Sequence, residues 1–322
     1  MIMDRLTENK IVLIKRKTRL EELIAKYNTI EQARFYIEHL GSDFSDYITE
    51  DERYKRALSD ACNGLEQLGR VQVVDRDFVP NYIFGPEDIV VVIGQDGLVA
   101  NTMKYLDGQP LIGVNPDPYR WDGILLPFKV SDLRLVVQDV FKRRRKVKEV
   151  SMAKAVLNDG QSIYAVNDLF IGQRTQVSSR YRLSVGERQE FQSSSGVIVS
   201  TGLGSTGWLK SILTGAINIV GSVAGETNSM GTRGSDSRQT VKRLDWDIDY
   251  LLFSVREPFP SRTTKADIVF GKVTESCPLK IVSQMPENGV IFSDGVESDY
   301  LRFTSGIEAT ITVADKKGHL VV

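Results

Sequence analysis

The chain has 322 residues, which is enough for about two domains of ordinary size. Hydrophobic residues make up 41% and charged residues 26%, a composition typical of globular proteins. The 41 Lys and Arg residues balance 42 Asp and Glu, so no chain-wide charge attracts nucleic acid or a membrane surface. No apolar run reaches the roughly 18 residues of a bilayer span. Two cysteines exclude a disulfide framework, and two histidines exclude His-rich metal sites. With no secretory signal at the start of the sequence, we expect a cytoplasmic protein.

Strand-like and helix-like segments alternate in the first half of the chain. The run 89–93 is apolar at every position, as in a central parallel strand. The predicted strands are 10–15, 71–74, 89–93 and 111–114, and the predicted helices are 20–40, 54–68 and 98–106. This alternation predicts a doubly wound α/β domain over residues 1–150.

After residue 150 short strands follow one another with few helices between them. The predicted strands are 164–166, 169–171, 181–185, 196–200, 250–255, 268–270, 279–282 and 290–292. Asp294-Gly295 fits a hairpin turn, and 221–242 is rich in Gly, Ser and Thr, which predicts a mobile loop. We therefore expect a mainly antiparallel β-sandwich domain over 151–300. Residues 301–322 form a C-terminal segment that could return to the first domain.

Gly94-Gln95-Asp96-Gly97 stands directly between the strand 89–93 and the helix 98–106. Glycines in such a turn let backbone N–H groups approach an anion, and the helix N-terminus adds a favourable dipole. An aspartate would repel phosphate unless it holds Mg²⁺ or accepts a proton from an attacking hydroxyl. Taken alone, the four residues favour an ordinary βα turn in which Asp96 caps the helix.

The segment Ser200-Thr-Gly-Leu-Gly-Ser-Thr-Gly-Trp208 contains the pattern G-x-G-x-x-G after a predicted strand and before a possible helix at 208–213. A dinucleotide fingerprint would also need a second strand with an acidic residue about 20 residues on, where this chain has the Gly/Ser-rich loop. A dehydrogenase of the Rossmann type is therefore weakly supported. The exposed backbone still suits a polar, flat ligand on which Trp208 could stack.

Asn167-Asp168 precedes an apolar strand. Two short polar side chains there can bind ribose hydroxyls or a base edge, although both residues are also ordinary turn formers.

Together the three motifs resemble the NAD kinase family. The family's GGDG turn aligns with Gly94–Gly97, its Asn-Glu pair with Asn167-Asp168, and its T-x-x-G-S-T/K-A-Y/W segment with Thr201–Trp208. The mitochondrial-type branch is the most similar, through sequences like those at 112–118, 167–172, 194–196 and 253–258. The resemblance extends from about residue 8 to about residue 315.

The resemblance implies a two-domain enzyme of NADP biosynthesis. MgATP would donate its γ-phosphate to the 2′-hydroxyl of the NAD adenosine ribose, with Mg²⁺ carried by the nucleotide and no metal ligands supplied by the chain. Asp96 would orient or deprotonate that hydroxyl. The other binding residues implied are Gly94, Gln95, Gly97, Asn167, Asp168, Thr201, Gly204, Ser205, Thr206, Gly207 and Trp208. The family also implies a homo-oligomer, either a dimer or a tetramer.

The sequence departs from the family at Gln95, which replaces a motif glycine, and at Asp168, which replaces Glu. If position 95 requires a positive φ, glutamine costs on the order of 1–2 kcal/mol there. Two alternatives therefore stay open: an NAD(P)-binding sensor that has lost transfer, and a kinase of another hydroxyl substrate such as a sugar or a lipid. Polyphosphate as donor and NADH as acceptor are open as well.

Overall fold

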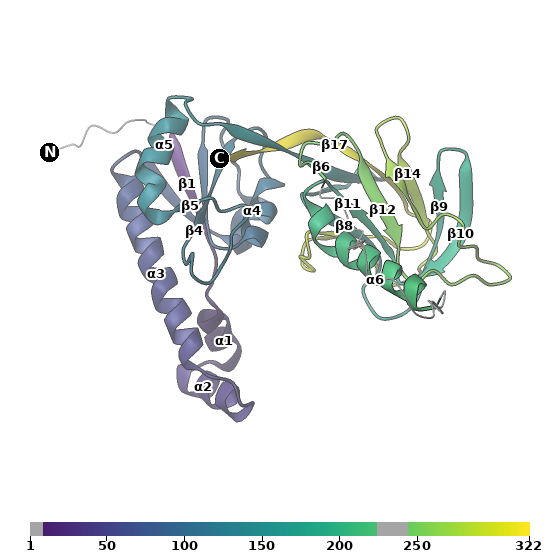
Figure 1. Cartoon of the computed structure of the whole chain (residues 1–322), viewed down its shortest axis with the longest axis horizontal. Helices are drawn as coiled ribbons and strands as arrows, with labels where there is room; N and C mark the ends of the chain where they lie inside the picture. The colour runs from purple at the N-terminus through teal and green to yellow at the C-terminus, as the bar shows by residue number, and fades with distance from the viewer. Residues whose placement is uncertain (1–8, 224–243) are drawn as a thin grey trace, which may run out of the picture. The chain divides into compact units, whose positions relative to one another are not determined.

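The computed structural model describes residues 9–223 and 244–322. They form two compact units, of which the first comprises the described part of Met1–Glu149 with Gly318–Val322, and the second Val150–Lys317 (Figure 1). Two long strands, β6 (Val147–Leu157) and β17 (Glu308–Val321), continue along the chain from one unit into the other.

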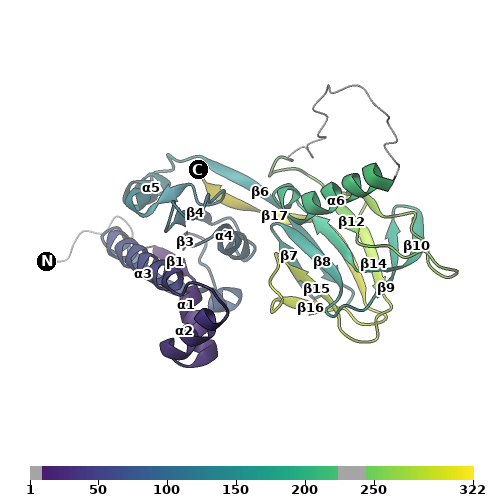
Figure 2. The ribbon, with the colours of Figure 1, turned by 60° about the horizontal axis from the view of Figure 1, so that its bottom comes forward.

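The first unit is built on a parallel sheet in the order β2-β1-β3-β4, and β4 also pairs with β5 and with the end of β17. All five residues of β3 are buried, as the unbroken apolar run requires. Helices α3 and α5 pack on one face of this sheet, while α4 lies on the other (Figure 2). The bounds are β1 Lys10–Lys15, β2 Arg70–Asp75, β3 Ile89–Ile93, β4 Pro110–Asn115, β5 Phe128–Lys129, α3 Ser45–Glu66, α4 Asp96–Met103 and α5 Leu133–Phe141. The predicted doubly wound α/β architecture is confirmed.

One predicted helix of this unit is wrong. The segment 20–40 forms two helices, α1 (Arg19–Tyr27) and α2 (Ile30–His39). The break falls at Asn28, which has a φ of 68°, and the Thr29 hydroxyl then caps α2 by accepting from the Gln32 N–H. Helical spacing continues across the break, so periodicity alone gave no sign of it. The helix predicted from residue 54 begins earlier, at Ser45.

The second unit is a sandwich of two mainly antiparallel sheets. One sheet has the order β13-β12-β11-β8-β15-β16, and the other contains β10-β9-β14-β17 together with β6 and β7. Side chains such as Ile171, Val199, Tyr181 and Ile281 fill the space between them. The bounds are β7 Ser162–Ala165, β8 Asp168–Gln173, β9 Ser179–Val185, β10 Arg188–Ser194, β11 Val197–Ser200, β12 Leu251–Val255, β13 Phe270–Val273, β14 Leu279–Ser283, β15 Gly289–Ser293 and β16 Tyr300–Arg302. The predicted β-sandwich is confirmed.

Two expectations for the second unit are corrected. Helix α6 runs over Trp208–Val223, so the loop expected at 221–242 does not begin at residue 221. Its remainder, from residue 224, lies outside the described residues. The strand expected at 268–270 is β13, which begins at Phe270. Strand β10, with the sequence RQEFQSS, was not predicted because it is polar.

Within the described ranges, no helix combines the length and apolarity needed to cross a bilayer. In the same residues, no three His, Cys, Asp or Glu side chains converge as ligands for a metal ion. Cys62 and Cys277 are both free thiols.

Candidate functional site

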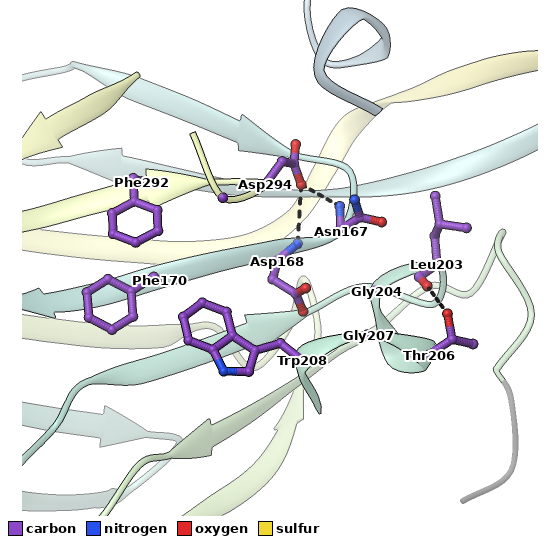
Figure 3. A pocket seen from close by; sticks show the side chains of 11 residues that line it. Asn167, Asp168, Phe170, Leu203, Gly204, Thr206, Gly207, Trp208, Phe292 and Asp294 are labelled. Carbon is purple, nitrogen blue, oxygen red and sulfur yellow. Dashed lines mark hydrogen bonds between the residues drawn. The ribbon is translucent and has the colours of Figure 1, made fainter. Parts of the chain in front are cut away.

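A cavity of about 320 Å³ opens in the second unit where β8 begins (Figure 3). Six residues expected to bind the nucleotide line it, namely Asn167, Asp168, Gly204, Thr206, Gly207 and Trp208. The other five lining residues were not predicted to belong to a site. They are Phe170, Leu203, Phe292, Asp294 and Gly295.

Asp294 holds the backbone that precedes β8. Its carboxylate accepts hydrogen bonds from the N–H groups of Val166, Asn167 and Asp168, at 3.1, 2.6 and 3.3 Å (Figure 3). In return its own N–H donates to the Asp168 carbonyl oxygen at 2.9 Å. Asp294 and Gly295 have φ values of 54° and 71°, which suit the turn between β15 and β16. The pair that the sequence marked as a hairpin turn therefore also fixes the position of Asn167 and Asp168.

The Asp168 carboxyl group is the electrostatically unusual feature of the cavity. Its Oδ1 is buried, and no described residue gives it a hydrogen bond. Burial raises the pKa of Asp168 to about 7, a contact with the Ser200 hydroxyl lowers that pKa, and the nearby Asp294 charge raises it. A buried oxygen without a partner is costly, and a ligand hydroxyl that donates to it would remove that cost.

Thr201 and Ser205, which the resemblance implies as binding residues, are buried and do not line this cavity. The Thr201 hydroxyl donates to the Val166 carbonyl at 2.6 Å and accepts from the Gly204 N–H at 3.1 Å. The Thr201 N–H donates to the Asn167 carbonyl at 2.9 Å. Ser205 donates to a carbonyl of its own turn at 2.7 Å. Both hydroxyl residues thus shape the segment and tie it to the strand that carries Asn167.

Gly204 is required by the same packing. A Cβ atom at this position would lie 2.1 Å from the carbonyl oxygen of Asn167, a separation that no side chain tolerates. At Gly207 the nearest atom to an added Cβ is 3.4 Å away, so that glycine meets no such obstacle. Close contact between two backbone segments therefore explains one of the two glycines.

An aromatic cluster of Phe170, Trp208 and Phe292 forms the apolar wall (Figure 3). The Phe170 and Trp208 rings are stacked at 6.0 Å between centroids, and those of Phe170 and Phe292 at 4.8 Å. Phe170 fits beside Gly172 and Gly196, where an added Cβ would come within 2.8 and 2.7 Å of its ring. Such a wall suits a planar ring.

In the first unit, the Gly94–Gly97 turn has an unstrained backbone. Gln95 is the N-cap of α4 with a φ of −123°, so the expected penalty of a left-handed glutamine does not arise. A Cβ at Gly94 would lie 2.9 Å from Leu98 Cδ2, whereas one at Gly97 would have nothing within 4 Å. Gly94 therefore serves packing, and Gly97 leaves open space at the start of the helix.

Asp96 is the first residue of α4 and anchors the chain that follows β4. Its Oδ1 accepts from the Leu125 N–H at 2.7 Å, and its Oδ2 accepts from the Ile124 N–H at 3.3 Å. A carboxylate has about four acceptor positions, so both oxygens can take a further donor. The sequence did not indicate this anchoring contact, because it joins segments far apart in the chain.

No family model matches the sequence, and no curated protein sequence is significantly similar to it. Solved structures, in contrast, are similar to this chain. The crystal structure of yeast NADH kinase complexed with NADH matches with a TM-score of 0.55 at 14% identity, covering 98% of this chain and 84% of that one. An NAD kinase from Archaeoglobus fulgidus in complex with ATP matches with a TM-score of 0.53 at 15% identity, covering 98% and 93%. The chain therefore has the fold of the NAD kinases.

Proposed function

We propose that the protein is a phosphotransferase that moves the γ-phosphate of ATP to the 2′-hydroxyl of the NAD adenosine ribose, producing NADP. One observation carries the proposal: Asp168 lines a cavity walled by stacked aromatic rings, and its buried Oδ1 has no hydrogen-bond partner among the described residues. A ribose attached to a purine presents hydroxyl donors next to a planar ring. The Asp168 carboxyl group can accept from the hydroxyls, and the aromatic wall can pack against the ring. The fold is shared with a kinase crystallised with NADH and another crystallised with ATP.

In this proposal the Gly94–Gly97 turn receives the phosphates of the donor. The N-terminus of α4 supplies N–H groups and a positive dipole end, and the open space beside Gly97 admits a phosphate. Mg²⁺ arrives with ATP as part of the substrate and offsets the charge of the phosphates and of Asp96.

Asp96 is proposed to orient or deprotonate the attacking hydroxyl. Its anchoring bonds to the Ile124 and Leu125 N–H groups fix the direction of the carboxylate and leave lone pairs for a substrate proton. The proton of the 2′-hydroxyl would pass to this carboxylate as the new O–P bond forms, while the bond between the γ-phosphorus and the bridging oxygen of ATP breaks and ADP leaves. Because the backbone at Gln95 is extended, the replaced glycine gives no conformational reason for lost transfer.

The test is NADP formation from NAD and MgATP, measured in a coupled assay with the full chain and with Asp96→Asn. We expect kcat to fall at least about 100-fold in the variant, the lower range for a positioned general base. Asp60→Asn, on the exposed side of α3, is the matched control and should leave kcat unchanged.

Wild-type protein that binds NAD but forms no NADP would contradict the proposal. ADP release with a sugar or a lipid as the acceptor would then point to a kinase of another hydroxyl. Binding without any turnover would point to an NAD(P) sensor.

A further inference from the structure

A second cavity, of about 160 Å³, adjoins the first in the same unit. The two share the aromatic wall of Phe170, Trp208 and Phe292. The remaining lining residues of the second cavity are Gln173, Arg174, Arg256, Val290, Glu297 and Tyr300. We call it the arginine pocket, because two guanidinium groups line it.

Aromatic rings hold both guanidinium groups in place. The Arg256 guanidinium lies 5.2 Å from the Trp208 ring centroid, and that of Arg174 lies 5.3 Å from the Tyr300 centroid. Stacking on a ring uses the face of a guanidinium and leaves the N–H groups on its edge free to donate. The arginine pocket is therefore organised to recognise an acceptor-rich group.

Hydrogen bonds to neighbouring backbone also hold the main chain of each arginine. The Arg256 N–H donates to the Gly196 carbonyl, and the Arg174 N–H donates to the Asn288 carbonyl, both at 2.8 Å. Arg174 and Arg256 therefore lie directly after β8 and β12, each held by a backbone hydrogen bond.

The charge of the arginine pocket favours a small anion. Two guanidinium groups face one carboxylate, that of Glu297. Glu257 is 3.7 Å from Arg256, but its side chain is 63% exposed, so this ion pair is weak. Among anions, phosphate matches the donor fork of arginine best, because it accepts two parallel N–H bonds.

We propose that the arginine pocket is a phosphate subsite of the acceptor site. The acceptor is then a nucleotide whose planar ring packs against the shared aromatic wall while its 5′-phosphate contacts Arg174 and Arg256. A bare nucleoside would fill only the first cavity. The inference rests on the proposed function in taking the first cavity as the acceptor site.

The experiment compares the binding of AMP and adenosine to the full chain by titration calorimetry, which requires no turnover. We expect AMP to bind at least about tenfold more tightly than adenosine, as charge-assisted bonds to phosphate predict. Arg174→Gln and Arg256→Gln should each reduce this ratio toward one. Glu297→Gln should raise it, because the opposing carboxylate is then neutral. Free inorganic phosphate should compete with AMP and not with adenosine.

Arg262→Gln is the matched control, since Arg262 is exposed in the same unit and lines neither cavity. Circular dichroism of each variant checks that it is folded. An AMP-to-adenosine ratio near one in the wild type, or a ratio that survives both arginine substitutions, overturns the inference. A wild type that prefers AMP over adenosine but forms no NADP would contradict the proposed function and leave this inference standing.

Discussion

The raised pKa of Asp168 makes folding stability dependent on pH. In the folded chain the pKa is about 7, against an ordinary value of 3.8. The native state therefore holds this proton more tightly than the unfolded state, and ionisation favours unfolding. Stability due to this group is fully present below about pH 4 and is lost as the pH rises through 7. With these two pKa values the linkage relation gives a loss of about 2.5 kcal/mol between pH 5 and pH 8.

The perturbation that isolates this effect is Asp168→Asn, which keeps the shape of the side chain and removes its titration. We expect the free energy of unfolding, measured with urea, to fall between pH 5 and pH 8 by about 2.5 kcal/mol more in the wild type than in the variant. Fluorescence of Trp208 and Trp246 reports on the unit that contains Asp168. Asp267→Asn, an exposed change of equal charge in the same unit, is the control. Equal pH dependence in the wild type and Asp168→Asn would refute the reasoning.

Three further substitutions, the first with a control, test the packing that supports the two candidate sites. Gly204→Ala should lower stability by about 1–3 kcal/mol and weaken AMP binding, because the new methyl meets a carbonyl oxygen at 2.1 Å. The control Gly215→Ala, in α6 of the same unit, adds a methyl with nothing within 4 Å and should reduce neither quantity in calorimetry. Gly113→Ala places a methyl 1.9 Å from the Leu125 carbonyl oxygen and should shift the Leu125 N–H that donates to Asp96, so kcat in the NADP assay should fall. An unchanged kcat would show that this hydrogen bond is not needed for catalysis. Phe170→Ala should cost about 3–5 kcal/mol in urea unfolding, and a cost under 1 kcal/mol would show that the aromatic cluster is not tightly packed.

The local sequence determined those features whose physical cause is local. The apolar run 89–93 became β3 with its predicted bounds, because a strand buried on both faces tolerates no polar residue. Gly94 and Gln95 fell between β3 and α4, and Asp96 and Gly97 begin the helix, close to where the glycine spacing placed the turn. The predicted single helix over 20–40 was wrong because the spacing of apolar residues continues past Asn28. The helix ends there because Asn28 takes a positive φ.

Tertiary structure decided which residues reach the site. Thr201 and Asp294 are both polar residues next to strands, yet the first turns inward to bind backbone while the second supports Asn167 and Asp168 from another part of the chain. Phe170 alternates with core residues of β8, and only the second sheet determines which face is the interior and which is the cavity wall. Such roles depend on contacts between separate segments of the chain, which for Asn167 and Asp294 lie 127 residues apart. A hydrogen bond across that distance leaves no mark in local composition or periodicity, so only the folded chain reveals it.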